Sequence, residues 1–196
     1  PYCFPPMYHL ADVLRIFCHI YNLTFIFYLE NQNWSIEILI FRQRISRLPG
    51  NIDNEKMNFD TVQVPSTWQR TGYQNPCYLN TRYEFPMTLP VVPDEMSVGV
   101  YCKSFKIKKE NSHPVITFLG VCSSLTLYVN GKYVGYSEGS HNSAEFELDG
   151  FVNKGDNELL AVVSRWCNGT YLECQDMFRE NGIFRDVYIT ENPEAY

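Results

Sequence analysis

A loop predicted from Asn168 to Arg179 offers side chains that could do chemistry. It combines carboxylates, amides and aromatic rings between two apolar runs, and the candidates are Asn168, Tyr171, Glu173, Gln175, Asp176 and Phe178. Carboxylates and amides exchange hydrogen bonds with hydroxyls, and aromatic rings pack on the apolar face of a pyranose. Because binding residues usually lie on loops between strands, this composition favours a sugar site. Loop capping and turn formation remain the alternative.

A second polar and aromatic cluster runs from Tyr73 to Asn80, with the sequence YQNPCYLN. It offers the same kinds of side chain as the later loop. Composition alone does not choose here between ligand binding and turn formation.

Catalysis by this chain alone is not expected. Retaining glycoside hydrolysis needs two carboxylic acids about 5 Å apart, one as acid and one as nucleophile. Glu173 and Asp176 are the nearest pair in the sequence, but both fall on one loop and nothing marks either as an acid of raised pKa. We therefore assign no catalytic residue to this chain.

The four histidines do not indicate a nucleophilic or metal site. None lies beside a GxSxG-type turn or in a Cys-His arrangement, and the sequence has no cluster of histidines and carboxylates. His113 precedes Pro114, and His141 follows Gly139-Ser140, so both are predicted to be solvated loop residues. The sequence also lacks a glycine loop that would cradle a phosphate.

The composition excludes several classes of partner. The formal net charge is −6, and no basic cluster could displace counterions from phosphates, so nucleic-acid binding is not expected. The seven cysteines are odd in number and lack CxxC spacing, which indicates reduced thiols packed as small hydrophobes in a cytoplasmic protein. The apolar segment Val13–Leu29 contains Arg15 and His19 without a preceding basic region, so no membrane role is predicted.

From Phe59 onward the sequence pattern is typical of an all-β protein. Short apolar runs alternate with turn residues, and Asn130-Gly131 suits a type I′ hairpin, in which both central residues take positive φ. Strands at this spacing indicate a β-sandwich or jelly roll. The predicted strands are Val98–Ile107, Val115–Leu119, Leu125–Val129, Tyr133–Tyr136, Glu145–Leu148, Glu158–Arg165 and Phe184–Ile189.

The first fifty residues are less regular. They predict a helix over Ala11–Ile20 and strands over Leu23–Tyr28 and Ile36–Phe41. The prolines of Pro86–Pro93 predict an extended surface loop, because proline lacks the donor that a central strand needs. We divide the chain into a divergent segment, residues 1–50, and a β-sandwich domain, residues 51–196.

Several motifs of the second part resemble one known family. They are VPSTWQ at 64–69, YLNTRY at 78–83, VNGKYVGY at 129–136 and, most specific, RWCNGTYLECQDMFRENGIFRDVYI at 165–189. Together they are similar to the sugar-binding domain of family 2 glycoside hydrolases of the β-galactosidase type. The resemblance covers about Phe59 to Pro193, and it implies a galactose-binding-like jelly-roll β-sandwich.

The resemblance also implies a function. The family hydrolyses terminal β-D-galactosides with retention, and its sugar-binding domain packs beside a catalytic (β/α)₈ barrel of the same, homo-oligomeric enzyme. Asn80 matches an asparagine that contacts substrate, and Asp176 matches an aspartate that binds galactose hydroxyls and sodium. The catalytic glutamates and the magnesium ligands lie in the barrel, which takes about 250 residues. We therefore expect the isolated 196-residue chain to be inactive.

The chain departs from the family at its start. The family's Leu-Asn-Gly-x-Trp-x-Phe strand is not found in residues 1–50. Two other functions stay open: a stand-alone carbohydrate-binding module, and a purely structural domain of a glycosidase. The choice of galactose rests on the resemblance alone.

Overall fold

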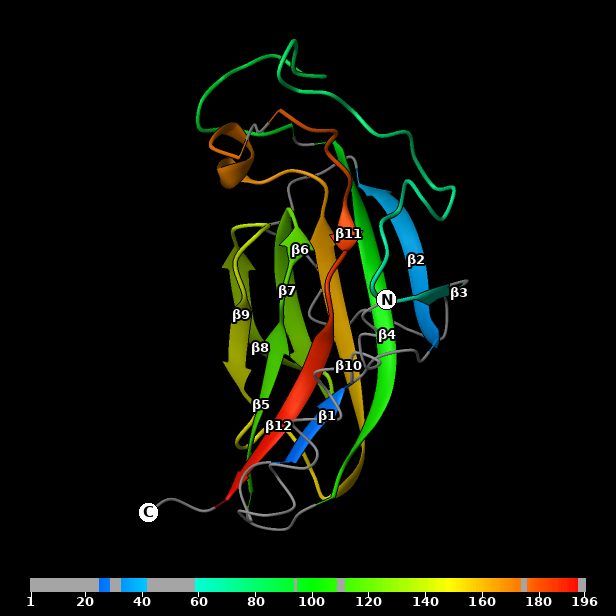
Figure 1. Ribbon diagram of the computed structural model, residues 1–196, viewed down its shortest axis with the longest axis vertical. Coiled ribbons are helices and arrows are strands. Elements are labelled where there is room, and N and C mark those ends of the chain that lie inside the picture. Colours follow the sequence, from blue (N-terminus) through cyan, green and yellow to red (C-terminus); the bar gives the residue numbers. More distant parts are fainter. Residues whose placement is uncertain are drawn as a thin grey trace, which may run out of the picture.

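Two antiparallel sheets packed face to face make up the computed structural model, which describes residues 25–28, 33–41, 59–93, 95–108, 112–173 and 176–193 (Figure 1). The six-stranded sheet has the order β3-β2-β4-β10-β7-β8, and the four-stranded sheet has the order β1-β12-β5-β9. A short pair, β11-β6, lies between them and the loops at one end of the molecule. The prediction of an all-β sandwich is confirmed.

The strands have the following bounds. Those of the six-stranded sheet are β3 Asp60–Gln63, β2 Asn33–Phe41, β4 Met96–Ile107, β10 Gly155–Ser164, β7 Ser124–Val129 and β8 Lys132–Glu138. Those of the four-stranded sheet are β1 Phe25–Tyr28, β12 Val187–Pro193, β5 Ser112–Phe118 and β9 Ala144–Glu147. The short pair is β11 Gly182–Ile183 with β6 Val121–Cys122, and a 3-10 helix, η3, spans Asn168–Tyr171.

Two local predictions were wrong. The predicted strand Phe184–Ile189 is interrupted, because residues 184–186 lie between β11 and β12 and pair with no strand as a ladder. His113 was placed in a loop before Pro114, but it lies within β5 opposite Asn192. A proline is tolerated in this strand at its beginning, where one missing donor disturbs the ladder least. The His113 side chain is half exposed and lies 3.1 Å from an Asp149 carboxylate oxygen.

The N-terminal strands join the sheets of the sandwich. β1 pairs with β12, and β2 lies between β3 and β4 with Trp34 opposite Val62 and Ile36 opposite Tyr101. The predicted strand Ile36–Phe41 is confirmed as part of β2, whose residues alternate polar and apolar from Asn33 to Ile38. The division at residue 50 stays a prediction, and the helix expected over Ala11–Ile20 lies outside the described residues.

The central pair of strands, β4 and β10, is buried on both faces at one end. Odd-numbered residues of β4, such as Tyr101 and Phe105, point into the core between the sheets. Met96 and Val98 point to the opposite face, where they pack with Val162, Trp166, Cys77 and Leu79 in a second apolar cluster. Because Cys77 and Leu79 belong to an irregular segment, this second cluster fastens that segment to the sheet.

Trp68 anchors the start of the same segment in the main core. Its ring is fully buried, and its indole N–H donates to the Tyr101 hydroxyl at 2.7 Å. Its backbone N–H donates to the Asn181 carbonyl at 2.8 Å, and the Ser66 N–H donates to the Ile183 carbonyl at 2.9 Å. Residues 66–68 and 181–183 are therefore held side by side.

The connections follow the turn chemistry of the sequence. Asn130 has φ 50° and Gly131 φ 74°, as a type I′ hairpin requires, so that prediction is confirmed. The predicted loop Pro86–Pro93 forms no strand and contains one isolated bridge between Thr88 and Val91. It arches over the end of the six-stranded sheet (Figure 1).

The described cysteines behave as small apolar residues. Cys77, Cys102, Cys122 and Cys167 are all free thiols. Burial raises the pKa of the Cys77 thiol, and it raises that of Cys102 to about 12 and that of Cys167 to about 11. Thiolates at these positions are strongly disfavoured, which suits packing rather than reactivity. Cys3, Cys18 and Cys174 lie outside the described residues.

Gly99 leaves the space that the Trp68 ring fills, and this predicts a stability effect. A Cβ at position 99 would lie 2.6 Å from a ring carbon of Trp68. We expect Gly99→Ala to lower the free energy of unfolding by about 1 to 3 kcal/mol through overpacking, measured by urea denaturation. Gly169→Ala is the control, since its Cβ would approach no atom closer than 3.4 Å. Equal stability of the two variants would contradict the packing described for Trp68.

Candidate functional site

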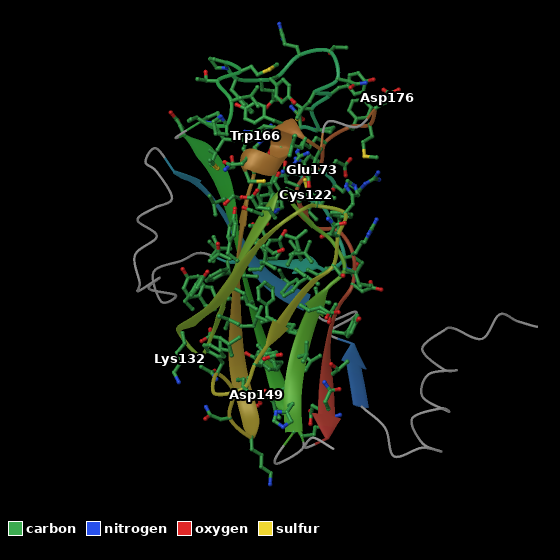
Figure 2. The ribbon with its side chains drawn as sticks, turned by 90° about the vertical axis from the view of Figure 1, so that its left-hand side faces the viewer. Cys122, Lys132, Asp149, Trp166, Glu173 and Asp176 are labelled. Atoms are coloured by element: carbon green, nitrogen blue, oxygen red, sulfur yellow. The ribbon has the colours of Figure 1, made fainter. Side chains whose placement is uncertain are left out.

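The candidate site lies at one end of the sandwich, where the loops after β3 and after η3 meet. Asp176 and Glu173 both lie at this end, opposite the end that carries Lys132 and Asp149 (Figure 2). The second apolar cluster and the Trp68 anchor lie below these loops. The sheets thus supply a rigid support, and irregular segments supply the exposed polar groups.

Asn80 and Asp176, the two residues expected to bind substrate, lie in direct contact. The Asn80 side-chain N–H donates to a carboxylate oxygen of Asp176 at 3.3 Å. The Tyr78 hydroxyl donates to the same oxygen. Both predicted residues are exposed, so their polar atoms face solvent at the end of the domain. Residues 96 positions apart in the chain therefore form one polar cluster.

Tyr78 and Phe178 add an aromatic surface beside that cluster. Their ring centroids are 5.8 Å apart, and 37% of Tyr78 and 65% of Phe178 are exposed. Large exposed rings next to a carboxylate and an amide match the needs of a pyranose, which has one apolar face and a rim of hydroxyls. These exposed side chains are of the types that contact a hydroxyl-rich ring.

Tyr78 was not singled out by the sequence, although a signal for it exists. Leu79 is buried in the second apolar cluster, while its neighbours Tyr78 and Asn80 are exposed. In an extended segment alternate residues point the same way. Once Leu79 is taken as the buried residue, Tyr78 and Asn80 are expected to face the same side.

Glu173, the other carboxylate of the loop, has a different environment from Asp176. It accepts hydrogen bonds from the Ser140 backbone N–H and hydroxyl, both at 2.6 Å, and its Oε2 lies 3.1 Å from an Arg179 nitrogen. Burial alone would raise the pKa of the Glu173 carboxyl, but the hydrogen bonds from Ser140 and the Arg179 guanidinium outweigh it and hold that pKa below its ordinary value. An ionised, fully bonded carboxylate does not suit a proton donor.

Two further candidates of these clusters, Tyr171 and Tyr73, have structural partners. The Tyr171 hydroxyl donates to the Val91 carbonyl at 2.7 Å, and its ring packs on Tyr83. Burial, together with the hydrogen bond that the Tyr73 hydroxyl donates to Asp60 at 2.8 Å, raises the pKa of Tyr73 to about 12. Asn168 is exposed at the start of η3. Gln175 lies outside the described residues.

His141 lies in the loop between β8 and β9 and is exposed, as expected from the sequence. Its ring centroid lies 5.5 Å from that of Phe184, and its backbone carbonyl accepts from Arg185 at 3.1 Å. It also lines a pocket of about 330 Å³ that opens beside Phe178 and Arg179. In the part of the chain that the structure describes, no nucleophilic side chain hydrogen-bonds the His141 ring, and we assign it no chemistry.

A sodium ion fits the donor chemistry of the Asp176 cluster. Sodium is a hard cation, and the carboxylate oxygens of Asp176 are suitable ligands because hard cations prefer oxygen donors. Within the described segments, no group of three His, Cys, Asp or Glu side chains could hold a metal ion. Asp176 would thus supply one part of a coordination sphere.

No helix in the described segments is long and apolar enough to cross a bilayer.

Comparison with known proteins identifies close relatives. The model of the sugar-binding domain of family 2 glycosyl hydrolases matches residues 32–193. A β-galactosidase of Actinobacillus pleuropneumoniae is 42% identical over 135 residues, which are 69% of this chain and 13% of that protein. A β-galactosidase of Alteromonas mediterranea is 38% identical over 176 residues, 86% of this chain and 17% of that protein. The chain therefore spans less than a fifth of these relatives.

Solved structures show the same fold. A β-glucuronidase of Bacteroides uniformis superposes with a TM-score of 0.62 at 19% identity, over 87% of this chain and 18% of that chain. A β-D-glucuronidase of Dictyoglomus thermophilum gives a TM-score of 0.56 at 16% identity, over 88% of this chain and 28% of that chain.

The buried Glu173–Arg179 pair predicts a pH-dependent stability. The pKa of Glu173 is lower in the folded chain than its ordinary 4.5, so its contribution is present above that value and is lost as the pH falls through the folded pKa. Each unit by which a pKa is lowered corresponds to about 1.4 kcal/mol. We expect the free energy of unfolding to fall more steeply below about pH 5 in the wild type than in Glu173→Gln, by denaturant titration across pH.

The matched control is Asp156→Asn, which removes an ion pair with Lys106 at the same N–O distance, 3.1 Å, but on an exposed surface. Exposed pairs contribute little because water screens them, so this variant should keep the wild-type slope. If Glu173→Gln also keeps that slope, the ionised state assigned to Glu173 is wrong.

Proposed function

The chain belongs to the sugar-binding domains of the family 2 glycosyl hydrolases, and from that premise we propose that it binds the galactosyl ring for a retaining β-galactosidase. The contact between Asn80 and Asp176 carries this proposal, because it joins a donor and a carboxylate acceptor at one exposed position. The names of the relatives, β-galactosidases at 35 to 42% identity, support galactose as the sugar.

Asp176 and Asn80 would act by fixing the orientation of the substrate. A carboxylate can accept hydrogen bonds from two neighbouring ring hydroxyls, and bonds to charged groups are the stronger ones. A bound sodium ion would add a hard positive charge that attracts further hydroxyl oxygens to the same place. Tyr78 and Phe178 would cover the apolar face of the ring. This chain thus holds the sugar and transfers no proton to it.

The acid and the nucleophile would come from a catalytic barrel. The chain spans only 13 and 17% of the two β-galactosidases described above, which leaves ample length for a barrel in proteins of that size. The other carboxylate near the site, Glu173, forms an ion pair with Arg179. We therefore propose that the isolated chain does not hydrolyse galactosides and binds galactose weakly, because half a site lacks the preorganisation on which affinity depends.

Exposed apolar side chains around the site support a partner domain there. Met177 and Phe178 follow Asp176 directly and are 51% and 65% exposed, while Leu172 is 88% exposed. Apolar residues gathered beside a polar site are typical of surfaces that another domain covers. A barrel docked here would exclude water from the substrate and strengthen the hydrogen bonds of Asp176.

The charge of Asp176 favours a neutral sugar over a uronic acid. A glucuronide carries its own carboxylate, which Asp176 would repel in a site closed off from water. Several structural relatives are β-glucuronidases, but they share the fold at under 25% identity. The site residues therefore favour neutral glycosides, and among these the names of the sequence relatives favour galactosides.

A chimeric enzyme tests the proposal. This chain would replace the matching segment in the β-galactosidase of Actinobacillus pleuropneumoniae, and hydrolysis of nitrophenyl β-galactoside and β-glucuronide would be measured. We expect activity on the galactoside, and a fall of kcat/KM by about 10- to 100-fold in Asp176→Ala, the size expected for losing a hydrogen bond to a charged group. The isolated chain should show no turnover.

Asp156→Ala, at a highly exposed position on β10, is the control and should keep wild-type kinetics. An active chimera in which Asp176→Ala matches the wild type would indicate a purely structural domain. Tight galactose binding by the isolated chain in calorimetry would instead favour a stand-alone binding module.

A further inference from the structure

Arg179 connects the two segments that carry the site residues. Its backbone exchanges hydrogen bonds with Cys77, at 2.7 Å from the Arg179 N–H and 3.3 Å from the Cys77 N–H. Its side chain donates to the Ser123 hydroxyl at 2.7 Å and to Glu173 at 3.1 Å. Only 8% of Arg179 is exposed. One buried residue therefore contacts the segment of Asn80 and the loop of Asp176.

The residues that make these contacts lie three positions away from Asn80 or Asp176 in the sequence. Cys77 lies three residues before Asn80, Glu173 three residues before Asp176, and Arg179 three residues after it. The ion pair between Glu173 and Arg179 thus closes the base of a short loop with Asp176 at its midpoint. A chain of three residues spans at most about 10 Å, so fixing both ends of the loop strongly limits where the Asp176 carboxylate can lie.

Packing of the loop's own side chains does not provide this restraint. Met177 and Phe178 are more than half exposed. The pocket of about 330 Å³ lies against both residues, so part of the space beside the loop is unfilled. The described part of the loop is therefore held by the polar contacts at its base together with the hydrogen bonds that Tyr78 and Asn80 donate to Asp176.

Other parts of the fold hold both residues of the ion pair in place. Glu173 accepts two hydrogen bonds from Ser140, in the connection between β8 and β9, and Arg179 donates to Ser123, between β6 and β7. Replacing a buried ion pair by apolar residues is often neutral for stability, whereas its directional bonds fix one geometry. The arrangement is thus better suited to placing the loop than to strengthening the fold.

We propose that Arg179 and Glu173 are positioning residues that set the distance between Asn80 and Asp176, and so the fit of the galactosyl ring. This proposal rests on the function proposed above for Asn80 and Asp176. Neither positioning residue needs to contact the sugar. Their effect on the substrate passes through Asp176.

A double-mutant cycle in the chimeric β-galactosidase tests this route. Glu173→Gln should reduce kcat/KM by about 10- to 100-fold, the usual cost of misplacing a binding group by about 1 Å. In the Asp176→Ala background, the same change should have little further effect, because the group that Glu173 positions is already gone. Equal losses in both backgrounds would show a role in folding alone and would overturn the proposal.

Two further variants keep the test decisive if Glu173→Gln folds poorly. Ser140→Ala removes one hydrogen bond to Glu173 and keeps the ion pair, so it should give a smaller loss with the same dependence on Asp176. Arg179→Lys keeps the charge without the planar fork of donors and should remain impaired. Wild-type kinetics in both variants would overturn the proposal. Asp156→Asn, which removes the exposed ion pair, is the control.

Hydrogen exchange in the isolated chain separates this proposal from the proposed function. Mass spectrometry should show a larger increase of exchange in Glu173→Gln for peptides around 77–80 and 176–180 than for β4 and β10, whose exchange reports the change in global stability. This outcome would support the positioning role even if the chimera proved inactive on galactosides, which would count against the proposed function only. An equal increase throughout the sheets and the two loops, or none at 77–80, would overturn the positioning role.

Discussion

The bridge between Cys77 and Arg179 joins two loops that lie 102 residues apart in the chain, and the candidate site depends on it. Neither loop forms regular strands at this place, so no continuous ladder holds them together. The bridge is possible because β4 and β10 run side by side and bring the segments before and after them to the same end of the sandwich. The sheet pairing thus decides which parts of a long sequence can share a ligand.

Beyond the ends of the sheets, hydrogen bonds of side chains hold the two loops together in place of a strand ladder. Backbone groups in irregular segments must find partners when they are buried, and here Asn181 and Gln69 exchange hydrogen bonds across the two loops. Asn181 also donates to the Arg165 carbonyl at 3.0 Å. Many polar residues of the run from 165 to 189 therefore support the loops, and only a few of them face a ligand.

The sequence was sufficient for the regular parts of the fold, because alternation of period two and the Asn130-Gly131 turn are local signals. The sequence also predicted Asn80 and Asp176 as site residues, through family motifs rather than through the spacing of residue types. The partners of Glu173 could not be predicted, since Ser140 lies 33 residues away and nothing local links the two positions. The strands predicted over Leu23–Tyr28 and Ile36–Phe41 contain β1 and most of β2, because apolar and β-branched residues mark both locally. The interruption at 184–186 was missed because Phe184 continues the apolar pattern of a strand.

The burial of Trp68 has a consequence for how such domains can diverge. A Cβ at Gly99 would meet the indole at 2.6 Å, and one at Gly182, whose φ is 122°, would lie 2.9 Å from the Tyr101 hydroxyl that bonds the same indole. The indole thus occupies volume that two distant glycines leave free. Evolution can enlarge Gly99 only together with a smaller or reoriented ring at position 68, whereas the positive φ of Gly182 favours glycine there whatever the size of that ring. Across related sequences positions 68 and 99 should covary, and a tryptophan at 68 should accompany loops that dock as they do here.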